Sequence, residues 1–186
     1  MKKVFEIVFE RINKIRLESE ICVDFWSKLL RLKGNYNESE CWDLLFDNIE
    51  WLVNKNIIKT LELIEWFSEK ELSDHNIYFK GSHVIKNNKA IGIGNCYIEA
   101  SGHSKVILFD SARCEGFDTS FVTCFNNSKA TVKDCIVNGF HNAKIVVKGF
   151  GLCEAWDDCI VVAENKSVVR KNENVSVSAG VGCTVI

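Results

Sequence analysis

Nine cysteines and four histidines are the side chains of this chain best suited to nucleophilic or metal chemistry. A zinc site usually needs Cys or His pairs at short spacing, and the sequence contains no C-x-x-C pair. Cys135 and His141 are near each other, yet no local signature of a catalytic thiol surrounds them. Glu99, Glu115 and Glu154 could supply paired carboxylates for glycoside cleavage. A repeat explains them more simply as solvent-facing residues, so we expect no catalytic, cofactor or metal site.

The repeat has a period of eight residues. From Cys96 it reads CYIEASGH, SKVILFDS, ARCEGFDT, SFVTCFNN and SKATVKDC. A seven-residue unit, IVNGFHN, follows, and the octads resume at Ala143 with AKIVVKGF, GLCEAWDD, CIVVAENK, SVVRKNEN and VSVSAGVG. Positions one, three and five are small or apolar, positions two and four are largely polar, and the last two positions collect Gly, Asp and Asn. The alternation predicts a short strand in each octad, and the last two residues predict a tight turn.

Strands and turns at a fixed interval predict a β-solenoid. One octad cannot enclose a core, whereas two octads give a coil of about 16 residues with two facing sheets. In this register most cysteines of the repeat point inward, and Cys135, at position eight, is the exception. A three-sided coil stays open as an alternative.

The pattern resembles the Ala/Ser-x-Val-x-Ala-aromatic-Asp/Gly-Asn octads of many uncharacterised bacterial and mobile-element proteins. ARCEGFDT, GLCEAWDD and SFVTCFNN carry this resemblance best, and it covers roughly residues 89–186. The resemblance implies the solenoid architecture. It implies almost nothing about activity, because solenoids host unrelated functions.

The residues before the repeat have helical periodicity. Helices are expected over residues 3–16 and 20–32, from an Asn37 cap through CWDLLFDNIEWLV, and over 60–67. We therefore predict an α+β protein with a small N-terminal helical segment followed by a C-terminal β-solenoid. The predicted domains are a helical bundle or capping domain at 1–75 and the solenoid at 76–186.

The charge is nearly balanced, with a net value of −2. Residues 1–75 carry 11 Lys/Arg and 15 Asp/Glu, whereas residues 76–186 carry 12 and 10. This balance gives no overall attraction to nucleic acid or to an anionic membrane. No apolar run is long enough to span a bilayer, and Glu6 and Glu10 interrupt the apolar residues near Met1. We expect no membrane partner and a cytoplasmic location.

Surface residues are the remaining candidates for a functional site. Aromatic residues recur at position six beside the predicted turns, where they either form an exposed row or fill the corners of the coil. The acidic residues of the third helix either bind a partner or form a solvated face. The candidate partner-binding residues are Phe109, Phe117, Phe125, Trp156, Asp157, Asp158, Glu40, Asp43 and Asp47. Lys129, Lys133, Lys144 and Lys148 add a modest basic patch, which alone would bind nucleic acid weakly.

These features predict a non-catalytic protein-binding module, because a rigid repeat loses little entropy on binding. By analogy with small solenoids that occupy the nucleic-acid channel of an enzyme, its most concrete form is an inhibitor of a nucleic-acid-handling enzyme. A phage or mobile-element anti-CRISPR protein is an example, and nucleic acid would take part only through the protein partner. The alternatives are a self-assembling homo-oligomeric solenoid and an enzyme acting on carbohydrate or a nucleotide.

Overall fold

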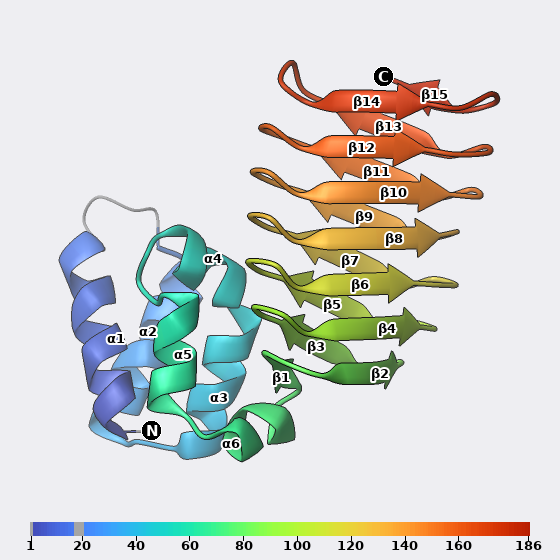
Figure 1. Ribbon diagram of the computed structural model, residues 1–186. Coiled ribbons are helices and arrows are strands. Elements are labelled where there is room, and N and C mark those ends of the chain that lie inside the picture. Colours follow the sequence, from blue (N-terminus) through green and yellow to red (C-terminus); the bar gives the residue numbers. More distant parts are fainter. Residues whose placement is uncertain (1, 17–20) are drawn as a thin grey trace. The chain divides into compact units, whose positions relative to one another are not determined.

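The computed structural model describes residues 2–16 and 21–186, in which helices precede a β-solenoid (Figure 1). The helices lie between Lys2 and Asp74, and the first strand begins at Ile77. The chain divides into two compact units, Met1–Ser68 and Glu69–Ile186. The α+β class and the order of its two parts agree with the sequence prediction.

The first unit is helical. Its helices are α1 (Lys2–Ile15), α2 (Val23–Gly34), α3 (Glu38–Asp47), α4 (Ile49–Asn54) and α5 (Thr60–Trp66). Helix α1 buries Phe5, Phe9 and Ile12, three side chains at helical spacing that form one apolar stripe. The predicted start of the second helix, Glu20, lies outside the described residues.

Two asparagines set the bounds of α3. The Asn37 side chain accepts a hydrogen bond from the Glu40 backbone N–H at 2.9 Å, which confirms the predicted cap. Asn48 separates α3 from α4, although the apolar pattern predicted one continuous helix. Its Nδ2 donates to the Leu44 carbonyl at 2.8 Å, and its backbone leaves the helical conformation at φ −117° and ψ 12°. Asparagine side chains compete in this way with the backbone hydrogen bonds of a helix.

The second unit begins with the short helix α6 (Glu69–Asp74) and continues as two parallel sheets. Sheet A contains β1 (Ile77–Tyr78), β3 (Lys89–Gly92), β5 (Lys105–Leu108), β7 (Phe121–Cys124), β9 (Ile136–Gly139), β11 (Leu152–Ala155), β13 (Val168–Lys171) and β15 (Thr184–Val185). Sheet B contains β2 (Ser82–Lys86), β4 (Tyr97–Ser101), β6 (Arg113–Gly116), β8 (Lys129–Lys133), β10 (Lys144–Lys148), β12 (Ile160–Ala163) and β14 (Ser176–Ala179). In Figure 1 the strands of sheet B lie in front of those of sheet A.

The coil is two-sided, as the octads predict. Tyr97 pairs with Arg113 in sheet B, and Val106 pairs with Val122 in sheet A, so equivalent residues of successive coils stack 16 positions apart. Residues at positions one, three and five fill one continuous core between the sheets. This register excludes the three-sided alternative.

Position seven of the octads has a left-handed backbone throughout most of the solenoid. The residues with positive φ there are Asn87, Gly94, Gly102, Asp110, Asp118, Asn126, Asp134, His141, Gly149, Asp157 and Asn165. Glycine, asparagine and aspartate reach this conformation most readily, and histidine is also enriched in it. The turn residues seen in the sequence are therefore explained by backbone geometry.

Two units are seven residues long rather than eight, namely residues 81–87 and 128–134. Ser82 pairs with Tyr97, and Lys129 pairs with Lys144, each across 15 positions. The predicted location of the deletion, at IVNGFHN, is therefore wrong. Cys135 occupies position one of the octad CIVNGFHN and is only 2% exposed, so it is not the outward exception that the sequence suggested.

In each seven-residue unit, the side chain at position seven accepts a hydrogen bond from the backbone of the next coil. Asn87 Oδ1 accepts the His103 backbone N–H at 2.9 Å, and Asp134 Oδ1 accepts the Phe150 backbone N–H at 2.8 Å. The facing residues are Gly102 and Gly149, where a Cβ would overlap the accepting oxygen.

The first coil lies against helix α6 of the same unit. Leu72 of α6 is fully buried, and Glu69 forms an ion pair with Lys80 at 2.7 Å. This helix covers part of a coil whose strand edge would otherwise be open to pairing with another chain.

Candidate functional site

Six of the seven solenoid cysteines are buried in the core between the sheets, and Cys183 packs against it. All nine cysteines of the chain are free thiols, and burial raises the pKa of Cys96 and Cys159 to about 11 and that of Cys153 to about 12. A thiol that stays protonated at neutral pH is a poor nucleophile and a poor metal ligand. Among the residues described, no group of three or more His, Cys, Asp or Glu side chains is arranged to hold a metal ion.

Cys135 and His141 do not form a nucleophile and base pair. The Cys135 thiol is buried, donates to the Lys133 carbonyl at 3.0 Å, and lies 3.2 Å from Ser120 Oγ. Burial raises its pKa. His141 is exposed at a turn, where its Nδ1 accepts the Asn126 backbone N–H at 3.4 Å.

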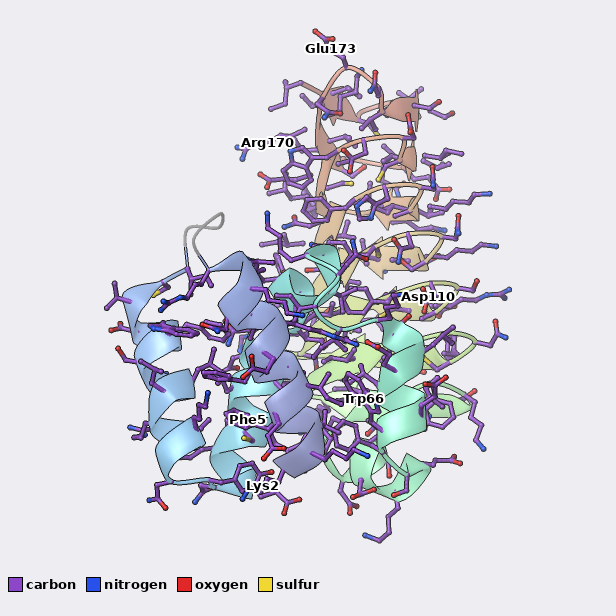
Figure 2. All side chains as sticks on the ribbon, turned by 90° about the vertical axis from the view of Figure 1, so that its left-hand side faces the viewer. Lys2, Phe5, Trp66, Asp110, Arg170 and Glu173 are labelled. Carbon is purple, nitrogen blue, oxygen red and sulfur yellow. The ribbon has the colours of Figure 1, made fainter. Side chains whose placement is uncertain are left out.

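The three recurring glutamates lie on two different sheets. Glu99 and Glu115 are neighbours on sheet B, whereas Glu154 lies on sheet A and pairs with Arg170 at 3.0 Å. Figure 2 shows Arg170 projecting outward from the solenoid. The paired-carboxylate hypothesis is therefore restricted to Glu99 and Glu115.

The aromatic residues at position six form a stacked ladder along one corner. Phe109 stacks on Phe125 at 5.1 Å between ring centroids, Phe125 on Phe140 at 4.9 Å, and Phe140 on Trp156 at 4.7 Å. Phe109 and Phe125 are 0% and 3% exposed, whereas Phe140 and Trp156 are partly exposed. The two buried phenylalanines are not members of the apolar core between the two sheets.

Trp156, Asp157 and Asp158 lie at the turn between β11 and β12. Asp157 and Asp158 are both exposed. Asp157 Oδ2 accepts the His141 backbone N–H at 2.9 Å, so this carboxylate also links two coils. The sequence prediction missed Phe140, because placing the deletion at IVNGFHN removed this residue from the aromatic column.

Phe117 lies on a different surface, the outer face of sheet B, and is 36% exposed. This face carries a set of four lysines on the adjacent strands β8 and β10, which we call the lysine face: Lys129, Lys133, Lys144 and Lys148. Lys129 is paired in register with Lys144, and Lys133 with Lys148. The two ladders are separated by about 13 Å along the strands, and the lysines within each ladder by about 4.8 Å.

Apolar side chains accompany the lysine face. Val146 lies between the two lysine ladders, and the next strand, β12, exposes Ile160 and Val162 to 46% and 36%. Positions two and four of the repeat are largely polar. Val146, Ile160 and Val162 occupy these positions and are apolar. Their grouping would be visible in the sequence only after alternate octads had been assigned to the same sheet.

Glu40, Asp43 and Asp47 lie in the helical unit, on α3. Together with Asp24 of α2 they line a groove of about 420 Å³ between these two helices. Lys28 and Arg31 also line it, and Arg31 donates to Glu40 at 2.8 Å, so part of the negative charge is neutralised. The structure therefore gathers the three predicted acidic residues on one surface.

Comparison with known proteins gives no relative, because no family model, curated protein or solved structure matches the chain. None of the described helices is long and apolar enough to cross a membrane. The surfaces of this chain are therefore the remaining indication of its function.

Proposed function

We propose that the protein is a non-catalytic protein-binding module whose main contact surface is the outer face of sheet B. The observation that carries this proposal is the combination of the lysine face with the exposed side chains of Ile160 and Val162. Apolar side chains supply the favourable desolvation of a protein interface, and surrounding charges supply specificity and faster association.

The backbone of this face supports the proposal. Strands β4 to β12 pair in parallel without interruption, so their outward side chains are held at regular intervals. A surface held by a continuous hydrogen-bonded sheet loses little conformational entropy when a partner binds.

A more specific form of the proposal is an inhibitor of a nucleic-acid-handling enzyme, such as a phage or mobile-element anti-CRISPR protein. The acidic groove lined by Glu40, Asp43 and Asp47 supports this form, because clustered carboxylates can bind a cationic nucleic-acid channel. In this version the groove, rather than the lysine face, contacts the positively charged part of the enzyme.

The test is an affinity capture from host lysate with the tagged protein, performed with and without nuclease, followed by quantitative mass spectrometry. The proposal expects one protein partner in near-stoichiometric amount that survives nuclease and is lost with Lys144→Glu. The matched control is Lys105→Glu, which makes the same charge change at an exposed residue of sheet A. A triple variant, Glu40→Gln, Asp43→Asn and Asp47→Asn, tests the groove separately.

Two results would contradict the proposal. Retention that disappears with nuclease would show that nucleic acid is the bound molecule. Recovery of the protein alone, in large particles, would instead favour the self-assembling solenoid.

A further inference from the structure

The lysine face places like charges directly beside one another. Lys129 is the in-register neighbour of Arg113 on one side and of Lys144 on the other, so three cations stack along one ladder. Like charges at directly paired positions of a sheet oppose its stability. In the free protein this ladder therefore carries repulsion that a negatively charged partner would relieve.

Most of the positive charge of the lysine face is not paired with a carboxylate of the described residues. Lys148 pairs with Glu164 at 3.3 Å, but Lys129, Lys133 and Lys144 make no ion pair within residues 2–16 and 21–186. Glu115 is the acidic residue of the neighbouring strand β6, and it interacts with Tyr97. Burial is the main cause that raises the pKa of the Tyr97 hydroxyl, and the negative charge of the nearby Glu115 raises it further. Three of the four lysines are thus available to an external anion.

The surroundings of the lysines favour a protein over a nucleic acid. Phe117 borders one ladder, Ile160 borders the other, and Val162 extends the apolar centre beyond Val146. Phosphates would gain from the lysines but would leave these apolar side chains without partners. Glu115 and Glu164 flank the same face and would repel a polyanion whose charge is continuous.

We propose that the outer face of sheet B binds an acidic protein surface, whose carboxylates reach both lysine ladders around an apolar centre packed on Val146, Ile160 and Val162. This inference rests on the proposed protein-binding function and adds the chemistry of the partner. The partner needs carboxylates separated by about the 13 Å between the ladders, with apolar side chains between them.

Binding to defined polymers tests this chemistry directly. Isothermal titration calorimetry would compare a Glu/Tyr copolymer, poly-glutamate of equal length and a short duplex DNA at one salt concentration. The copolymer should bind more tightly than either poly-glutamate or DNA, because only the copolymer offers both charge and apolar surface. Lys144→Glu should weaken copolymer binding by roughly tenfold or more, since a contact is lost and a like charge is added.

Two variants separate binding from folding. Lys144→Glu breaks the cationic ladder, so its urea midpoint should equal or exceed that of the unmodified protein while its copolymer affinity falls. Lys105→Glu should leave copolymer affinity unchanged. Equal binding by Lys144→Glu, tightest binding to DNA, or no copolymer binding would each overturn the inference.

Failure of this inference is distinguishable from failure of the proposed function. A lysate partner retained equally by the unmodified protein and by Lys144→Glu would uphold protein binding and move the interface to another surface. Loss of the copolymer preference would refute the partner chemistry alone.

Discussion

Gly149→Ala is expected to destabilise the solenoid by about 2–3 kcal/mol. The backbone of Gly149 has a φ of +67°, and an L-residue in this left-handed region costs about 1–2 kcal/mol. The new Cβ also overlaps Asp134 Oδ1 and displaces it from the Phe150 backbone N–H. Loss of that hydrogen bond costs about 1 kcal/mol more.

A double-mutant cycle separates the two causes. Asp134→Gly removes the carboxylate and keeps the left-handed backbone accessible, so Gly149→Ala should cost only about 1–2 kcal/mol in that background. The assay is urea unfolding followed by far-UV circular dichroism. Gly34→Ala is the control, because nothing lies within 4 Å of a Cβ there and the residue ends helix α2. Equal cost of Gly149→Ala with and without Asp134 would refute the steric reasoning.

Three further predictions concern the core. Iodoacetamide should modify Cys22 rapidly and Cys183 slowly in the native protein, while mass spectrometry finds the seven buried cysteines labelled only after unfolding. Because burial raises the folded-state pKa of Cys96 and Cys159 to about 11, their stabilising contribution is complete below pH 9 and is lost as pH rises toward 11. The urea midpoint should therefore fall over this range, and less steeply in Cys159→Ala. Phe125→Ala should cost about 3–5 kcal/mol in urea unfolding, because it removes a buried ring stacked on two others.

The solenoid was predictable because every coil needs the same residue types at the same positions of its strands and turns. Side chains alternate at period two wherever a strand lies over the core, and the left-handed position of each turn selects Gly, Asn or Asp. These requirements recur in nearly every coil, so the period is visible in a single sequence.

The location of the shortened unit was not predictable by the same reasoning. Cys135 is small enough for the buried position one, yet it also completes SKATVKDC as an eighth residue. The two possible registers are distinguished by the turn after β8. There, Asp134 Oδ1 accepts a hydrogen bond from the backbone N–H of Phe150, 16 residues later in the next coil. Keeping Phe140 in the aromatic column would have given the correct register, since CIVNGFHN then reads as a complete octad.

The candidate surfaces were only partly predictable. Aromatic type alone does not distinguish Phe125, buried in the corner ladder, from Phe117, exposed on sheet B. Their octads belong to different sheets, and exposure also changes within one column, from buried Phe125 to partly exposed Phe140 and Trp156. The four lysines were visible as a basic patch, but their stacking in two ladders around Val146 requires the strand register.

The most direct test of the account is lysine acetylation of the captured complex compared with the free protein, read by peptide mass spectrometry. If the outer face of sheet B is the protein-binding surface, labelling of Lys129, Lys133 and Lys144 should fall several-fold in the complex, while Lys105 on sheet A keeps its rate. Unchanged labelling of the three lysines in a complex that survives nuclease would contradict the central claim.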